Sequence, residues 1–170
     1  MDTTAKLYSL TYDQAKTYLF ALVFIVGNLV LPQIAHMVPG GGLTWLPIYF
    51  FTLIAAYKYG IRVGLLTAIL SPLANYLLFG MPTAAVLPAI LVKSSLLAVA
   101  ASYAAHRFGK VSIVAILLSV LAYQFVGTAI EWALIEKDFF VAVQDFRIGI
   151  PGILVQVFAG YLVLKAIAKL

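Results

Sequence analysis

The sequence predicts an all-α membrane protein, a bundle of six transmembrane helices with both termini in the cytoplasm. Composition, the length of the apolar stretches and the distribution of positive charge all support this prediction. Of the 170 residues, 64% are hydrophobic and 10% are charged, and the mean hydropathy is +1.07. Ordinary globular chains carry about 25% charged residues. Because a soluble chain of this length could not bury so much apolar surface, we expect one integral membrane domain over residues 1–170.

Six apolar stretches are separated by short connections. A helix needs about 20 apolar residues to cross a hydrocarbon core of ~30 Å. The first stretch is too long for a signal peptide and lacks a cleavage site, so we expect it to remain as a helix. The second stretch is short, and no connection is long enough for a separate soluble domain. The predicted spans are residues 17–35, 44–57, 63–79, 83–105, 111–134 and 148–167.

Positive charges alternate between the connections, and this alternation predicts the orientation. Lys/Arg-rich connections are retained on the cytoplasmic side of a membrane. With six crossings, eight of the 11 Lys and Arg residues lie inside, whereas Lys137 and Arg147 lie outside and Lys93 lies within a helix. The eight are Lys6, Lys16, Lys58, Arg62, Arg107, Lys110, Lys165 and Lys169.

Composition and motifs exclude several classes of function. The chain has no cysteine, and therefore neither disulfides nor a thiolate metal site. It has no basic run or basic face, which argues against nucleic acid as a partner. The histidines His36 and His106 fall on opposite faces of the membrane and have no second ligand nearby, so we expect no metal. No nucleophile motif and no phosphate-binding glycine loop is present. We therefore expect neither enzymatic activity nor a cofactor.

Lys93 is the exception to the alternation and the first candidate site residue. It lies ten residues into the fourth predicted helix, about 15 Å deep. A lysine at such depth costs about 2.5–3.5 kcal/mol, so it faces the bundle interior, a wet cavity or a partner charge. One interpretation is a structurally paired or snorkelling lysine, and the other is a cationic anchor for an anionic group of a ligand. Glu131 is the natural counter-charge, although its predicted position is nearer the surface.

Polar side chains recur at helical spacing on several predicted spans. Gln124, Thr128 and Glu131 are separated by four and three residues, which places them on one face of the fifth helix. Gln156 marks the sixth helix, and Asn75 ends a similar stripe on the third. Some of these side chains form hydrogen bonds between helices. The stripe on the third helix favours a structural role, although Asn75 at its end is also a candidate ligand contact. Gln124, Glu131 and Gln156 favour a ligand-lined interior.

Aromatic residues and a glycine-rich segment mark the outer side. Trp45 and Trp132 fall at the outer ends of their helices, with Tyr49 one turn from Trp45. They form either an interfacial aromatic belt or a surface on which a flat ligand ring stacks. The segment of Pro39, Gly40, Gly41 and Gly42 is either a plain turn or a mobile lid.

Residues 38–82, VPGGGLTWLPIYFFTLIAAYKYGIRVGLLTAILSPLANYLLFGMP, resemble the substrate-binding S components of energy-coupling factor (ECF) vitamin transporters. The likeness extends over about residues 27–105. It consists of a glycine-rich external loop, a helix starting near a Leu-Pro pair, an aromatic-ended inside turn and a short Gly-x-Pro external turn. The six-helix count and the length agree with that family.

The resemblance implies a division of labour in a prokaryotic plasma membrane. An S component captures a vitamin or its precursor from outside, under a loop that closes over it, and delivers the solute with a transmembrane T subunit and two ATPases. Family pockets are built mainly from the fourth to sixth helices, which here points to Lys93, Gln124, Glu131 and Gln156. The chain departs from the family in one respect, because Ala21 is followed by Ile25 where many members have Ala-x-x-x-Ala for docking the T subunit.

Two other classes remain open. A structural scaffold, such as the rod-shape-determining D family, has a similar size and helix count but needs neither a ligand cavity nor a lid. A stand-alone small-solute carrier is expected to show inverted repeats or broken helices in matching halves, which the sequence lacks.

Overall fold

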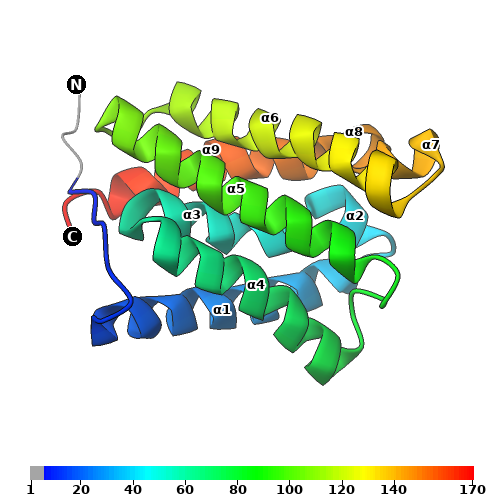
Figure 1. Ribbon diagram of the computed structural model, residues 1–170, viewed down its shortest axis with the longest axis horizontal. Helices are drawn as coiled ribbons and strands as arrows, with labels where there is room; N and C mark the ends of the chain where they lie inside the picture. The colour runs from blue at the N-terminus through cyan, green and yellow to red at the C-terminus, as the bar shows by residue number, and fades with distance from the viewer. Residues whose placement is uncertain (1–5) are drawn as a thin grey trace.

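The structure is a computed structural model that describes residues 6–170, and within these residues it contains helices and connections but no strand. The prediction for the N-terminus itself concerns residues 1–5, which lie outside the described residues. The long helices lie roughly parallel along one axis of the molecule (Figure 1). They are α1 (Ala15–His36), α4 (Ile61–Phe79), α5 (Leu87–Phe108), α6 (Ile113–Ile130) and α9 (Ile150–Ala166). Shorter elements are α2 (Gly41–Trp45), η1 (Pro47–Tyr49), α3 (Phe50–Tyr59), η2 (Glu131–Ile135), α7 (Phe139–Ala142) and α8 (Gln144–Ile148).

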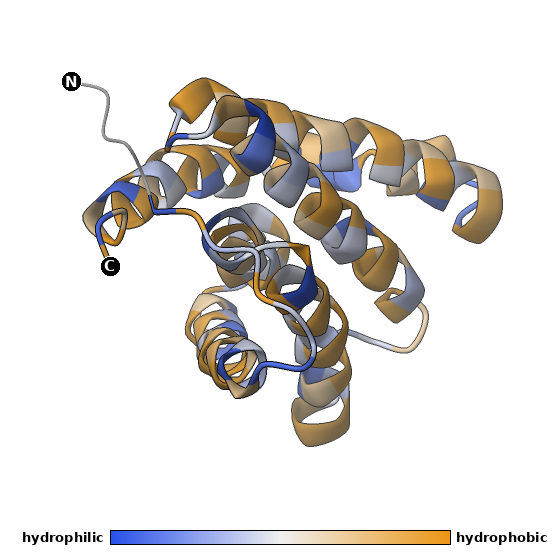
Figure 2. Ribbon diagram, turned by 60° about the vertical axis from the view of Figure 1, so that its left-hand side comes forward, coloured by the Kyte–Doolittle hydropathy of each residue, from blue (hydrophilic) through white to orange (hydrophobic). Residues whose placement is uncertain are grey.

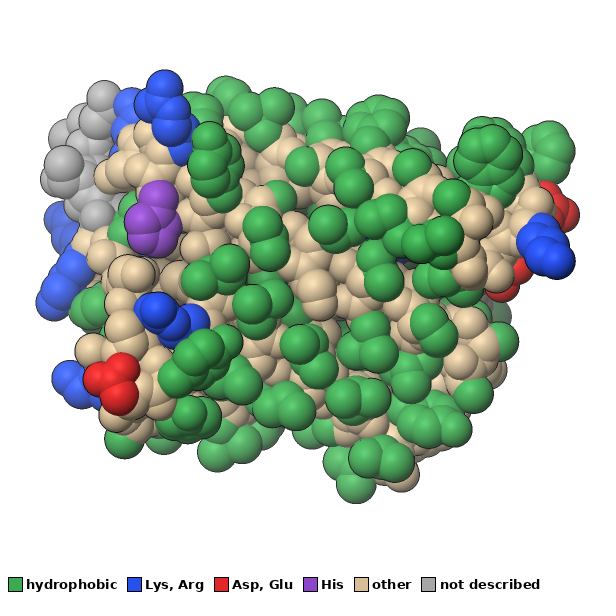
Figure 3. Space-filling view, viewed as in Figure 1, with side chains coloured by type: hydrophobic (Ala, Val, Ile, Leu, Met, Phe, Trp, Pro, Cys, Tyr) green, Lys and Arg blue, Asp and Glu red, His purple; other side chains and the backbone are tan. Residues whose placement is uncertain are grey.

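Four helices in the described part of the chain are long and apolar enough to cross a membrane. They are α1, α4, α5 and the continuous segment Ile113–Ile135, while α9 is apolar but shorter. Hydrophobic residues dominate every long helix (Figure 2). Charged side chains gather at the two ends of the molecule, and hydrophobic side chains cover the face between them (Figure 3). The chain is therefore an all-helical protein with the character of a membrane protein.

The second predicted span is interrupted, in contrast to the single helix expected over residues 44–57. Leu46 has a φ of 46°, in the left-handed region, and separates α2 from the η1 turn that begins at Pro47. A proline lacks a backbone N–H and disfavours helical geometry in the residue before it, which explains the break. The helix resumes as α3, which lies at the centre of the bundle and packs against α1, α4, α5 and α9. All residues from Thr52 to Tyr59 are buried.

Local sequence signals define the other helix ends. Pro88 occupies the first turn of α5, so this helix begins at Leu87 and the predicted residues 83–86 form a turn instead. Gly80 and Gly109 end α4 and α5 in left-handed conformation, which glycine adopts at little cost. Ser112 caps α6, where its hydroxyl accepts a hydrogen bond from the N–H of Ala115.

The two ends of the bundle differ in what they contain. The described N-terminal segment, the C-terminus and the α3–α4 and α5–α6 turns lie at one end, and the N–H of Lys6 donates to the carbonyl of Ala168. The α1–α2 and α4–α5 connections and the short helices α7 and α8 lie at the opposite end (Figure 1). We call this second end the loop end. It contains the candidate site.

Candidate functional site

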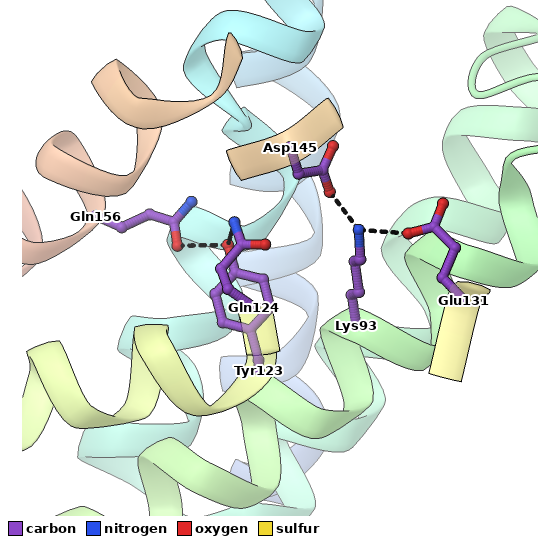
Figure 4. A network of polar contacts seen from close by, with 6 residues as sticks. All are labelled: Lys93, Tyr123, Gln124, Glu131, Asp145 and Gln156. Atoms are coloured by element: carbon purple, nitrogen blue, oxygen red, sulfur yellow. Dashed lines mark hydrogen bonds and ion pairs between the residues drawn. The ribbon is translucent and has the colours of Figure 1, made fainter. Parts of the chain in front are cut away.

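A buried ion-pair triad lies toward the loop end of the bundle. Lys93, on α5, is 2% exposed, and its Nζ lies 2.6 Å from Oε2 of Glu131 and 2.7 Å from Oδ2 of Asp145. Glu131 comes from η2 and Asp145 from α8, so the triad joins three segments that are separate in the sequence (Figure 4). A buried lysine in an apolar bundle requires such partners, because an unpaired charge there would be strongly disfavoured.

The local backbone brings each member of the triad to this point. Gly127 lets α6 approach α5 closely, since a Cβ added there would lie 2.6 Å from Cγ of Lys93. Glu131 opens a π-helical turn, in which its carbonyl accepts from the N–H of Glu136 at 2.7 Å. Such turns rotate the side chains that follow and are frequent at functional sites. Asp145 lies in the first turn of α8, and its carbonyl accepts from the N–H of Gly149 at 2.9 Å.

A cavity of about 180 Å³ adjoins the triad. Its walls come from the end of α1, the α2–η1 segment, the end of α4 and the first turns of α5. Most of the lining is apolar. Its polar groups are the triad, the amides of Gln33 and Asn75, the His36 ring and the Tyr49 hydroxyl. The lining residues are Pro32, Gln33, His36, Gly42, Leu43, Leu46, Pro47, Ile48, Tyr49, Asn75, Met81, Pro82, Val86, Ala89, Ile90, Lys93, Glu131 and Asp145.

A second polar network lies between α6 and α9 and does not line the cavity. The Tyr123 hydroxyl donates to Oε1 of Gln156 at 3.0 Å and accepts from Nε2 of Gln124 at 3.1 Å (Figure 4). The ring of Tyr123 lies 5.0 Å from that of Tyr49, which does line the cavity. Oε1 of Gln124 and Nε2 of Gln156 have no hydrogen-bond partner among the described residues. This network therefore supports the cavity wall through Tyr49 and leaves one acceptor and one donor unused.

The structure brings together some of the predicted site residues. Lys93, Glu131, Asn75, Tyr49 and Gly42 all line the cavity. Nδ2 of Asn75 also donates to the carbonyls of Asn28 (2.8 Å) and Ser71 (3.0 Å), so this residue ties α4 to α1 as well.

Other predicted residues lie elsewhere. Gln124 and Gln156 are buried behind the wall. Pro39 and Gly40 belong to the α1–α2 connection and Gly41 begins α2, and none of these three lines the cavity. Trp45 and Trp132 are 44% and 49% exposed, and neither lines the cavity. The ring of Trp132 packs against Phe139 at 5.4 Å.

Asp145 is the member of the triad that sequence analysis does not single out. It falls in the connection after the fifth predicted span, where Glu136 and Asp138 are equally plausible partners for a buried lysine. The need to neutralise Lys93 predicts an acidic partner in this connection. It does not distinguish Asp145 from Glu136 or Asp138. The cavity wall formed by residues 81–90 is also missed, because it consists of ordinary apolar residues.

The arrangement of an apolar cavity beside a few polar groups is suited to holding a small solute. Within residues 6–170, no group of His, Cys, Asp and Glu side chains is arranged to hold a metal ion. Concave, mainly apolar sites with a few convergent polar groups are typical of small-molecule binding. Comparisons with protein-family models, with curated proteins and with solved structures give no match to this chain.

Proposed function

We propose that the protein is the substrate-capture S subunit of an ECF-type importer in a prokaryotic plasma membrane. In this proposal it takes up a vitamin-like solute from outside and delivers it with a T subunit and two ATPases. The observation that carries the proposal is the cavity of about 180 Å³ at the loop end, lined by a buried ion-pair triad. Both the resemblance over residues 38–82 and the presence of Gly42, the last residue of the glycine-rich segment, in the cavity lining support it.

The proposal includes six crossings and both termini in the cytoplasm. In that topology α2, η1 and α3 together make the second crossing, and the loop end faces outward. A solute would then enter beside the α2–η1 segment, where Gly42, Leu43 and Leu46 line the cavity. The candidate lid is the preceding glycine-rich segment, Pro39–Gly42.

The proposal does not assign the face on which a T subunit would dock. Ala101 and Ala105 have the Ala-x-x-x-Ala spacing, but both are buried in the core. In the other pair of this spacing, Ala85 is exposed and Ala89 lines the cavity. The exposed apolar side chains of α1, which include Leu19, Leu22, Val23, Val26 and Val30, offer a surface for lipid or for a T subunit.

A structural scaffold is the second candidate, and one observation favours it. Lys93 finds two counter-charges within the chain, so its burial does not by itself require a ligand. If the protein is a scaffold, no specific ligand is expected in the cavity.

Native mass spectrometry of the protein purified in mild detergent tests the proposal. We expect a co-purified small molecule at about one per chain. Ala89→Phe places a ring inside the cavity and should abolish its retention, because Ala89 is a buried lining residue. Val99→Phe, at a 45% exposed position of the same helix, is the matched control and should retain the molecule. If lipid is the only molecule released from the wild-type protein, and Ala89→Phe gives the same mass spectrum, the result would favour the scaffold.

A further inference from the structure

The charged side chains that line the cavity do not balance. Among the described residues, the lining contains one lysine, Lys93, two acids, Glu131 and Asp145, and one histidine, His36. The formal charges of the triad, Lys93, Glu131 and Asp145, sum to one negative charge. In a medium of low dielectric an uncompensated carboxylate is costly, so a ligand that brings a positive charge is favoured at this site over one that brings a negative charge.

Hydrogen-bond acceptors are also in excess. Each carboxylate uses one oxygen, Oε2 of Glu131 or Oδ2 of Asp145, for the Nζ of Lys93. Within residues 6–170, Oε1 of Glu131 and Oδ1 of Asp145 have no hydrogen-bond partner. Figure 4 shows both of these second oxygens pointing away from Lys93. A carboxylate offers about four acceptor positions and no donor, so this end of the cavity is complementary to a donor group.

A third polar group of the lining is unpaired. Tyr49 is 2% exposed and lines the cavity, and its hydroxyl has no hydrogen-bond partner in the described part of the chain. A tyrosine hydroxyl is both a donor and an acceptor, so this group can pair with water or with a ligand in the cavity. The unpaired hydroxyl and the two free carboxylate oxygens belong to the same cavity, which is the arrangement expected of a site completed by its ligand.

We propose that the ligand is a small organic cation with a single ring, whose protonated nitrogen is held by Glu131 and Asp145. This inference rests on the proposed function, solute capture, and names the class of solute. A cavity of about 180 Å³ is slightly larger than the ~150 Å³ that accommodates a benzene ring. The ring contacts the apolar wall, and its far side reaches the amides of Gln33 and Asn75. The charge is opposite to the anionic group expected from Lys93 alone.

Three probes that share a single benzene ring and differ in charge test the inference. Benzylammonium, benzyl alcohol and benzoate are each titrated calorimetrically into the purified protein in detergent at pH 7. We expect benzylammonium to have the lowest Kd, at least tenfold below that of benzoate, which corresponds to about 1.4 kcal/mol. Benzyl alcohol should fall between them, because it keeps the ring and a donor but has no charge.

Substitutions of the two acids separate the effect of charge in the cavity from the effect of the net charge of the protein. Glu131→Gln and Asp145→Asn each remove the excess negative charge and should reduce the preference for benzylammonium over benzoate at least tenfold. Asp138→Asn is the matched control, since Asp138 accepts from the N–H of Phe140 in an exposed turn outside the cavity. It should leave the preference unchanged. If the acid variants do not fold, the ranking of the three probes on the wild-type protein decides alone.

The outcomes distinguish failure of this inference from failure of the proposed function. Benzoate binding as tightly as benzylammonium, or more tightly, overturns the cation and leaves solute capture standing. A co-purified solute without binding of any probe also overturns the cation alone. Absence of both a co-purified solute and probe binding overturns the inference together with solute capture.

Discussion

Replacing Lys93 with methionine should destabilise the fold by about 3–5 kcal/mol. At an effective dielectric of about 20, each ion pair at 2.6–2.7 Å is worth about 6 kcal/mol before other terms are counted. Desolvation of three charges and repulsion between the two carboxylates offset most of this attraction. Removing one partner of a buried pair nevertheless costs about 3–5 kcal/mol, because the remaining charges stay buried without compensation. Lys93→Met keeps the aliphatic stem, so packing changes little.

A second variant separates charge from packing. In Lys93→Met/Glu131→Gln/Asp145→Asn all three sites are neutral, and we expect this triple variant to recover at least half of the lost stability. Unfolding is followed in detergent by the fluorescence of Trp45 and Trp132. The control is Lys137→Met, the same change at an exposed position, with an expected effect within about 0.5 kcal/mol. The reasoning would be refuted if Lys93→Met were as stable as the wild type. It would also be refuted if the triple variant were no more stable than Lys93→Met.

Three further substitutions test other contacts by the same unfolding measurement or by hydrogen exchange. Tyr123→Phe removes the hydroxyl that links Gln124 to Gln156 and should cost about 1–3 kcal/mol, whereas Tyr103→Phe, 72% exposed, should be neutral. Gly152→Ala should destabilise by about 1–3 kcal/mol, because its Cβ would meet the backbone of Trp45; Gly160→Ala in the same helix meets only the end of Leu53 at 3.1 Å and should be tolerated. Lys58→Met removes the Nζ that donates to the carbonyls of Lys6 (2.6 Å) and Ala168 (3.2 Å). It should speed hydrogen exchange in both terminal segments, which exposed Lys16→Met should leave unaltered.

Composition and spacing are sufficient to predict the helical fold and two of the three members of the triad, Lys93 and Glu131. Apolar stretches of span length predict long helices, and the depth of Lys93 requires a counter-charge. The stripe of Gln124, Thr128 and Glu131 identifies the correct face of α6, because helical geometry is local. These predictions need no knowledge of how helices pack.

The remaining features depend on packing between distant segments. Asp145 reaches Lys93 through α8, whose position follows from the contact of α9 with the α2–η1 junction. That contact requires Gly152, where a Cβ would collide with the backbone of Trp45. The break at Leu46 likewise has a local cause, Pro47. The left-handed conformation of Leu46 itself depends on tertiary contacts, because it is unfavourable for a leucine. No pattern within one helix encodes either feature, and so the sequence alone does not predict the cavity.

The triad itself bears on the choice between solute capture and scaffold. Replacing a buried ion pair by apolar residues of similar volume is often neutral or stabilising, so stability alone does not account for three buried charges in an apolar bundle. For the same reason, an ionisable residue at membrane depth is by default a candidate functional residue. A scaffold would be equally stable with an apolar core at this position, whereas a solute site needs charge, acceptors and space together. All three are present at Lys93, Glu131 and Asp145 beside the cavity, which favours solute capture. If the neutral triple variant is as stable as the wild type and binds no solute, stability and binding are separable at this site, as this argument requires.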